Sequence, residues 1–406
     1  MMKVIRPEDK QQWPADFAYS VAKKVNAFVR RDLENSVVLK KHSQSAACFD
    51  RDEIRLGNLL GTGGFADAYE LEEIFCRRPG HSRENKSNRS HMAEETQKKA
   101  KGHAPYVVKC LKPKFSSESH EKCIDAGYGL VMEAQFLSAL EHPHILSIRG
   151  WASQGCTAFC HGYDGFFLIL DRLKTTLDQR IPEWSKQMAQ YKTAVVERMG
   201  RAGVPGLLFS GRLKVARDVA SALAYLHANG IMYRDLKPSN VGFDMEGNVK
   251  IFDFGLAREL PQDRELDEMF QMTALVGTPR YMSPEVGFAE AYNEKSDVYS
   301  LSLVLWEMMA LEKPFLEMSV RVHRKVVLGG GLRPEMDAAW PEGIKSLMQS
   351  SWDVDPRKRP TMRSVHRLLD NEVQKMRRST VTSKKVSHQR QTPVRSLSMM
   401  EKLRHH

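Results

Sequence analysis

Residues 233–240 read YRDLKPSN and are followed by DFG at residues 253–255, and these two stretches decide the fold and chemistry expected of the chain. Asp235 is a carboxylate that can accept a hydroxyl proton, and the lysine that follows it closely can neutralise phosphate charge. Asn240 and Asp253 offer hard oxygen ligands of the kind that suit magnesium bridging phosphate oxygens. In this order and spacing, the residues form the set that phosphoryl transfer requires.

Two patterns further upstream fit the same chemistry. The segment LGTGGFA at residues 60–66 lies between two strand signals, and glycine turns let backbone N–H groups approach phosphates. A strand follows this turn, whereas the dinucleotide-binding glycine motif opens a helix, which argues against that alternative. Lys109 lies in the apolar strand signal YVVKC and needs an anionic partner, for which Glu133 on the next expected helix is the natural choice.

With this order of motifs, the chain resembles the eukaryotic protein kinase family over about residues 54–370. The resemblance implies an α+β, two-lobed fold with a small β-rich N-lobe, a larger and mainly helical C-lobe, and ATP in the cleft between them. It implies ATP and Mg²⁺ as cofactors and a protein substrate. Lys237, close after Asp235, resembles serine/threonine kinases, and residues 352–361 look like the tyrosine-kinase-like branch of that group.

The resemblance also implies a role for each matching residue. Asp235 is the expected catalytic base, Lys237 neutralises the transferring phosphoryl group, and Lys109 holds the α- and β-phosphates while pairing with Glu133. The implied metal ligands are Asn240 and Asp253. The implied nucleotide contacts are Leu60, Gly61, Thr62, Gly63, Gly64, Ala68, Val107, Lys109, Leu170, Asp171, Leu173, Asn240 and Asp253.

Other positions match residues that support the site in the family. Glu285 ends the expected activation segment and is expected to form a salt bridge with Arg359. Asp297 matches the residue that braces the catalytic loop, and Thr278 matches a threonine that contacts the catalytic aspartate. Arg234 resembles an arginine that pairs with a phosphate on the activation segment.

Thr273 is the leading candidate for that phosphate, because it is the only hydroxyl-bearing residue between Gly255 and Gly277. The alternative is a constitutive negative charge from Glu265, Asp267 or Glu268.

Four positions depart from the family pattern. Ala66 replaces a loop glycine, Ala68 a valine that covers adenine, and Gly242 a larger apolar residue on the pocket floor, so a roomier adenine pocket is expected. Tyr233 replaces a histidine and is expected to stack on Phe254. None of these changes removes a charge that the reaction needs.

Two alternatives stay open. A pseudokinase would bind nucleotide or partners without catalysis, but it normally lacks the lysine, the base or the metal-binding aspartate. A nucleic-acid-binding protein rests only on the net charge of +11, whose excess lies in polar segments without interleaved aromatics.

The organisation expected along the chain follows from shifts in composition. An N-terminal extension with one short amphipathic helix precedes the kinase domain, two insertions interrupt it, and a basic, disordered tail follows. The first insertion is expected to be a disordered loop. The expected bounds are 1–53 for the extension, 54–173 for the N-lobe with an insertion at 77–105, 174–370 for the C-lobe with an insertion at 182–205, and 371–406 for the tail.

The chain shows no signal of export or membrane insertion. The N-terminus lacks the apolar run of a signal peptide, and the longest apolar stretch, 301–311, is too short to span a bilayer. The six cysteines do not fall into paired metal-ligand spacing and are expected to be free thiols. An intracellular, cytoplasmic protein without a transmembrane segment or a specific nucleic-acid partner is therefore expected.

Overall fold

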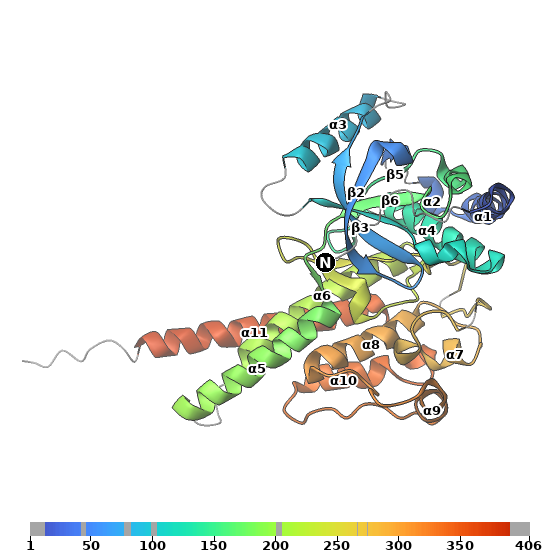
Figure 1. The fold of residues 1–406 in the computed structure, drawn as a ribbon. Coiled ribbons are helices and arrows are strands. Elements are labelled where there is room, and N and C mark those ends of the chain that lie inside the picture. Colours follow the sequence, from blue (N-terminus) through green and yellow to red (C-terminus); the bar gives the residue numbers. More distant parts are fainter. Residues whose placement is uncertain are drawn as a thin grey trace, which may run out of the picture.

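Strand-forming segments dominate the chain before residue 173 and helical segments dominate after it, and the computed structural model follows this division (Figure 1). The structure describes residues 13–41, 46–76, 83–98, 104–199, 205–265, 267–273 and 275–389. A sheet with four packed helices forms the described part of one lobe, and a mainly helical bundle forms the other. The expected two-lobed α+β fold is confirmed.

One six-stranded sheet forms the N-lobe, in the order β1-β5-β6-β4-β3-β2. All neighbouring pairs are antiparallel except β1 and β5, which are parallel. Because β1 comes from the expected N-terminal extension, the sheet begins before residue 54. The strands are β1 (Ala47–Phe49), β2 (Ile54–Thr62), β3 (Ala66–Ile74), β4 (Tyr106–Leu111), β5 (Ile148–Ala152) and β6 (Phe167–Asp171).

Two helices pack against each other beside this sheet. α4 (His120–Ala139) is buried along most of its length, and Ser119 caps its first turn by accepting a hydrogen bond from the Lys122 amide. α1 (Ala15–Asn35) lies against α4 and against the 3₁₀ segment η4 (Gly155–His161). Its buried side chains recur at helical spacing, as the amphipathic pattern predicts, but the helix is longer than the short one expected. A short helix of four residues, α2 (Val38–Lys41), follows α1.

The first insertion is not the disordered loop expected at 77–105, because α3 (Arg83–Gln97) occupies much of it. Arg89 anchors this helix: its guanidinium lies 2.6 Å from a Glu53 carboxylate oxygen, donates to the Cys48 carbonyl at 2.7 Å, and covers the Phe49 ring. The polar composition hid this contact because one buried arginine, rather than an apolar stripe, provides much of the anchoring. Residues 77–82 and 99–103 lie outside the described residues.

Seven helices form the described part of the C-lobe. α8 is apolar nearly all round and lies in the centre of the core, as its sequence predicts. The second, α6, ends before Gly230, which has a φ of +71° and provides the predicted left-handed stop. The helices are α5 (Leu177–Met199), α6 (Pro205–Ala228), α7 (Pro284–Gly287), α8 (Lys295–Ala310), α9 (Val320–His323), α10 (Glu342–Ser351) and α11 (Met362–Gln389).

One further expectation about a segment needs correction: α11 continues through 371–389, where a disordered tail was expected. α5 covers much of the expected insertion at 182–205, for which the sequence predicts no particular structure. α11 starts on a buried apolar stripe against α6, and once begun, a helix extends at one hydrogen bond per residue. Figure 1 shows α5 and α11 extending from the same side of the C-lobe. Residues 200–204 and 390–406 lie outside the described residues.

Short strands of the C-lobe hold the two loops that carry residues 233–240 and 253–255. β9 lies between β7 and β10, and β8 pairs with β11. Residues 233–240 fill the connection from β8 to β9, and residues 253–255 fill the connection from β10 to β11, so these pairings bring the two motifs together. The strands are β7 (Thr175–Thr176), β8 (Ile231–Met232), β9 (Val241–Phe243), β10 (Val249–Ile251) and β11 (Arg258–Glu259).

Within the described part of the chain, none of the helices combines the length and the apolar character needed to cross a membrane.

Candidate active site

Lys109 connects the two lobes at the centre of the site. Its Nζ lies 2.6 Å from Oε2 of Glu133, on α4, and 2.9 Å from Oδ1 of Asp253, in the C-lobe. Burial alone would lower the pKa of Lys109, but the carboxylates of Asp253 and Glu133 outweigh it and raise that pKa. Lys109 is therefore held as a cation, and the pairing with Glu133 that the sequence predicts is present.

Asp235 lies among three side chains that fix its carboxylate. Lys237 Nζ lies 2.7 Å from Oδ2, and the Thr278 hydroxyl donates to Oδ1 at 2.9 Å. Asn240 Nδ2 donates to Oδ2 at 3.1 Å and to the Asp235 carbonyl at 3.0 Å. Burial raises the pKa of Asp235, while Lys237 and Thr278 oppose that shift. The carboxylate is thus oriented, hydrogen-bonded and more basic than an exposed aspartate.

Asp297, at the start of α8, supports residues 233–240, the catalytic loop, through hydrogen bonds to its backbone. Its carboxylate accepts hydrogen bonds from the backbone N–H of Tyr233 at 2.9 Å and of Arg234 at 2.8 Å, as expected. Nε2 of His227 lies 2.9 Å from Oδ2 of Asp297 and adds a third contact, which no motif in the sequence predicts. The support matters because Arg234 has a left-handed φ of +68°, a conformation that costs free energy in a residue with a Cβ.

Tyr233 and Phe254 are both buried and in contact, with ring centroids 5.2 Å apart. The rings meet edge to face at 73°, so the expected contact is present but the expected stacking is wrong. The Tyr233 hydroxyl donates to the Phe252 carbonyl, which also ties the catalytic loop to the segment that carries Asp253.

The side chains of Asn240 and Asp253 fit a magnesium ion bound together with nucleotide phosphates. Asn240 donates through Nδ2 and Asp253 contacts Lys109 through Oδ1, so Oδ1 of the amide and Oδ2 of the carboxylate lie outside these contacts. Magnesium prefers such hard oxygens and usually takes its other ligands from phosphates and water. Asp253, like Arg234, has a φ of +68°. Among the described residues, no cluster of three or more histidine, cysteine or acidic side chains forms a metal cage.

The N-lobe sheet aligns four of the predicted nucleotide contacts on one face. Ala68 pairs with Lys109, and Val107 pairs with Leu170, in adjacent strands. Because Val107 and Lys109 are two residues apart in β4, all four side chains point to the same face. Asp171 alternates to the other face, where Arg149 binds it at 2.7 and 2.8 Å. Its side chain therefore lies away from the predicted nucleotide contacts.

The glycine turn joins β2 and β3. The Gly63 amide donates to the Ala66 carbonyl at 2.8 Å and closes the turn. A Cβ placed on Gly61 or Gly64 would have no protein atom within 4 Å, so packing within the described protein does not demand glycine there. Backbone that a ligand can approach closely is a separate reason for glycine at such positions.

The predicted enlargement of the adenine pocket at Gly242 is wrong. A Cβ at Gly242 would lie 2.5 Å from Cδ1 of Leu173, so the leucine side chain already fills the space that the glycine leaves. The sequence could not show this compensation, because Leu173 lies between β6 and β7 whereas Gly242 lies in β9, and only the fold brings them together.

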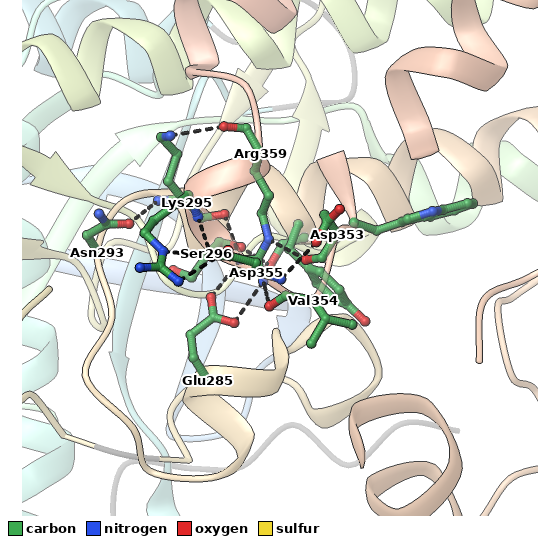
Figure 2. Close-up of polar contacts among 12 residues, drawn as sticks. Glu285, Asn293, Lys295, Ser296, Asp353, Val354, Asp355 and Arg359 are labelled. Atoms are coloured by element: carbon green, nitrogen blue, oxygen red, sulfur yellow. Dashed lines mark hydrogen bonds and ion pairs between the residues drawn. The ribbon is translucent and has the colours of Figure 1, made fainter. Parts of the chain in front are cut away.

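Arg359 clamps the end of the activation segment to the C-lobe core (Figure 2). Its two terminal nitrogens bind both oxygens of Glu285, at 2.6 and 2.8 Å, and its Nε donates to the Asp353 carbonyl at 2.8 Å. Lys295 returns a hydrogen bond to the Arg359 carbonyl at 2.9 Å. The Arg359 side chain is fully buried and Glu285 nearly so, and the pairing is the one that the sequence predicts.

Tyr292 connects Arg234 to Thr273, because its hydroxyl contacts both residues. Arg234 donates to the Tyr292 hydroxyl at 3.1 Å, and that hydroxyl donates to the Thr273 carbonyl at 2.8 Å. Asp267, one of the alternative sources of negative charge, binds Lys295 at 3.0 Å instead. A second, Glu268, accepts from the backbone amide of residue 265 at 2.9 Å.

A two-lobed fold whose interface gathers a lysine–glutamate pair, a buried aspartate and two further oxygen-bearing side chains is typical of a protein kinase. In a comparison with protein families, residues 94–369 match the protein kinase domain, which is more than half of the 406 residues. The chain therefore belongs to the eukaryotic protein kinase family. The match begins within α3, so β2 and β3 precede it.

Individual proteins with similar sequences are described as serine/threonine-protein kinases. Serine/threonine-protein kinase STY17 of Arabidopsis thaliana is 36% identical over 158 residues, which are 39% of this chain and 27% of that protein. A probable serine/threonine-protein kinase of Dictyostelium discoideum is 32% identical over 240 residues, 59% of this chain and 13% of that protein. A probable LIM domain-containing serine/threonine-protein kinase of the same organism is 34% identical over 159 residues, 39% of this chain and 23% of that protein. The chain thus spans well under half the length of these relatives.

Proposed function

We propose that the chain is a catalytically active protein kinase that transfers the γ-phosphate of Mg-ATP to serine or threonine hydroxyls of proteins. One observation carries the proposal: Lys109 lies 2.6 Å from Glu133 and 2.9 Å from Asp253, so a single cation joins the N-lobe helix to the metal-binding segment. In a kinase, the lysine–glutamate pair and the contact of the DFG aspartate with magnesium must both be in place for catalysis. The first of these is formed here, and Lys109 holds Asp253 next to it.

Each charged group of the site has a step to perform in this reaction. Asp235 accepts the proton of the acceptor hydroxyl as the hydroxyl oxygen attacks the γ-phosphorus, the bond from that phosphorus to the β,γ-bridging oxygen breaks, and ADP leaves. The raised pKa of Asp235 favours holding that proton. Lys237, 2.7 Å away, neutralises charge on the transferred phosphoryl group. Lys109 holds the α- and β-phosphates. Asn240 and Asp253 would hold magnesium, which would neutralise phosphate charge when bound.

Serine or threonine is the proposed acceptor, with two lines of support. Lys237 and Thr278 both contact Asp235, in the arrangement that the resemblance to serine/threonine kinases implies. The similar proteins of Arabidopsis and Dictyostelium are described as serine/threonine kinases. An intracellular, cytoplasmic location is proposed separately, because none of the six cysteines, all within the described part of the chain, takes part in a disulfide.

Phosphate transfer with and without the base tests the proposal. Full-length protein is incubated with γ-labelled Mg-ATP and mixed peptides that contain serine, threonine or tyrosine as the sole acceptor. We expect label on serine or threonine, and a decrease of about 100-fold or more in kcat for Asp235→Asn, because the base is lost while the shape is kept. Nucleotide binding without transfer to any peptide would instead favour the pseudokinase.

Phosphorylation of Thr273 is the proposed means of activation. A phosphate there would enter the neighbourhood of Arg234, which now contacts Tyr292, and charge-assisted hydrogen bonds to the guanidinium would order the activation segment. We expect phosphatase treatment of the phosphorylated wild type to lower kcat to the level of Thr273→Ala. Equal kcat for Thr273→Ala and phosphorylated wild type would contradict this switch.

A further inference from the structure

The N-terminal helices make a set of polar contacts with the activation segment that the proposed reaction does not use. Asp32, near the end of α1, accepts a hydrogen bond from the Tyr128 hydroxyl of α4 at 2.5 Å. Its Oδ2 also lies 3.0 Å from the Arg258 guanidinium, in β11. One carboxylate therefore joins three segments: the extension, the helix that carries Glu133, and the start of the activation segment.

A second carboxylate, on the activation segment, binds back to the N-terminal extension. Glu259, the next residue of β11, accepts from the backbone amides of Val37 and Val38 at 3.0 and 3.2 Å and from the Ser36 hydroxyl. Ser36 is buried and also accepts from the Leu39 amide at 2.9 Å, which places these groups at the first turn of α2. Glu259 thus satisfies backbone donors of the extension that the short helix leaves open.

The remainder of α1 is fixed along α4, so these polar contacts end a continuous interface. Buried Trp13 donates through its indole N–H to the Phe115 carbonyl at 2.9 Å. Midway, a Cβ on Gly127 of α4 would lie 3.2 Å from both Val25 and Phe159, so only glycine fits this close approach without displacing a neighbour. The extension therefore packs against α4 and the segment just before it, from Trp13 to the end of α1.

The contacted part of α4 is adjacent to the reaction site. A Cβ on Gly129 would lie 3.4 Å from the Gly255 carbonyl oxygen, so α4 touches the DFG segment directly after Tyr128. Glu133 follows one helical turn later and reaches Lys109. β11, which carries Arg258 and Glu259, begins shortly after the same DFG segment and pairs with β8 next to the catalytic loop.

We propose that Asp32 and Glu259 are positioning residues of the kinase reaction, which tie α4 to the start of the activation segment through the N-terminal extension and so keep Glu133 within reach of Lys109. This inference rests on the proposed function. α4 can pair Glu133 with Lys109 only in one position, so contacts made only in that position shift the population toward the competent state.

The charges in this contact suit such a role. Burial alone would raise the pKa of Asp32, but the Tyr128 hydroxyl and the guanidinium of Arg258 outweigh burial and lower it. Asp32 is therefore ionised at neutral pH, and its side chain is 11% exposed. The Arg258 side chain is 44% exposed, so only the Asp32 side of this pair is shielded from salt.

Charge reversal and its rescue test the proposal in the full-length chain. We expect Asp32→Arg to lower kcat about fivefold or more, as does Arg258→Asp, and the double variant Asp32→Arg/Arg258→Asp to recover most of the loss. Glu259→Gln should also lower kcat. Asp16→Asn, an exposed change in the first turn of the same helix, is the matched control and should leave kcat unchanged.

Amide hydrogen exchange separates a positioning role from a purely structural one, and from failure of the proposed function. We expect faster exchange in residues 127–139 and 256–260 of the single variants, and recovery in the double variant. If the wild type transfers no phosphate, this exchange pattern alone decides whether the extension holds α4. Unchanged exchange in these segments, or a lower melting temperature with wild-type kcat where all variants are folded, would overturn the proposal.

Discussion

At the scale of single residues, the state of Asp235 depends on a balance between burial and its neighbours. Burial favours the protonated carboxyl, whereas Lys237 and the Thr278 hydroxyl favour the carboxylate. The general base acts only when it is deprotonated. The pH at which activity declines on acidification therefore reports this balance.

Thr278→Val should move that decline to higher pH. Loss of the hydrogen bond to Oδ1 removes a group that lowers the pKa of Asp235, so the carboxyl is protonated at a higher pH. We expect kcat/KM at neutral pH to fall about tenfold, equivalent to roughly 1.4 kcal/mol. Thr157→Val, at an exposed threonine in η4, is the control. An unmoved acid limb in the pH profile of kcat/KM would show that Thr278 does not set the pKa of the base.

The motif residues of the site could be predicted individually from the sequence, because the reaction restricts their type and order. The pairs Lys109–Glu133 and Glu285–Arg359 were both expected and both occur. Compensation between distant residues could not be predicted. Leu173 fills the space over Gly242 because of the way the chain folds, and no local pattern in the sequence indicates it.

At the scale of elements, the sequence predicted those with a regular apolar pattern and missed those held by a few specific contacts. α4 and α6 follow their apolar patterns, and α8 follows its nearly continuous apolar run. α3 lacks such a pattern, and its anchor is the buried pair of Arg89 and Glu53. Polar composition alone therefore does not establish disorder when one buried ion pair can dock a helix.

Removal of the Arg359 clamp should destabilise the C-lobe strongly. Arg359→Ala leaves the Glu285 carboxylate buried without the guanidinium, and breaking a buried ion pair in this way costs about 3–5 kcal/mol. Arg357→Ala, which breaks an exposed pair with Asp355 two residues away, should change the free energy of unfolding little. Urea unfolding of both variants measures the difference. Equal stability of the two would mean that Arg359 is not a structural clamp.

At the scale of the whole molecule, the chain joins a kinase domain to an extension that packs on it. The extension adds β1 to the sheet, lays α1 along α4 and reaches β11, so it contacts both lobes of the domain. The sequence suggested an amphipathic helix there but not its position, since the contacts lie up to 226 residues apart in the chain. The motifs predicted the catalytic class, and the fold was needed to show how the extension joins it.

The measurement that tests the central claim most directly is the single-turnover rate of γ-phosphate transfer by the full chain at saturating Mg-ATP, with nucleotide binding measured in parallel. We expect the wild type to transfer phosphate to a serine or threonine peptide. Asp253→Asn should lose transfer by about 100-fold or more, because it weakens both the magnesium site and the contact with Lys109. A wild type that binds Mg-ATP tightly and transfers no phosphate, with Thr273 phosphorylated, would contradict the account and identify the chain as a pseudokinase.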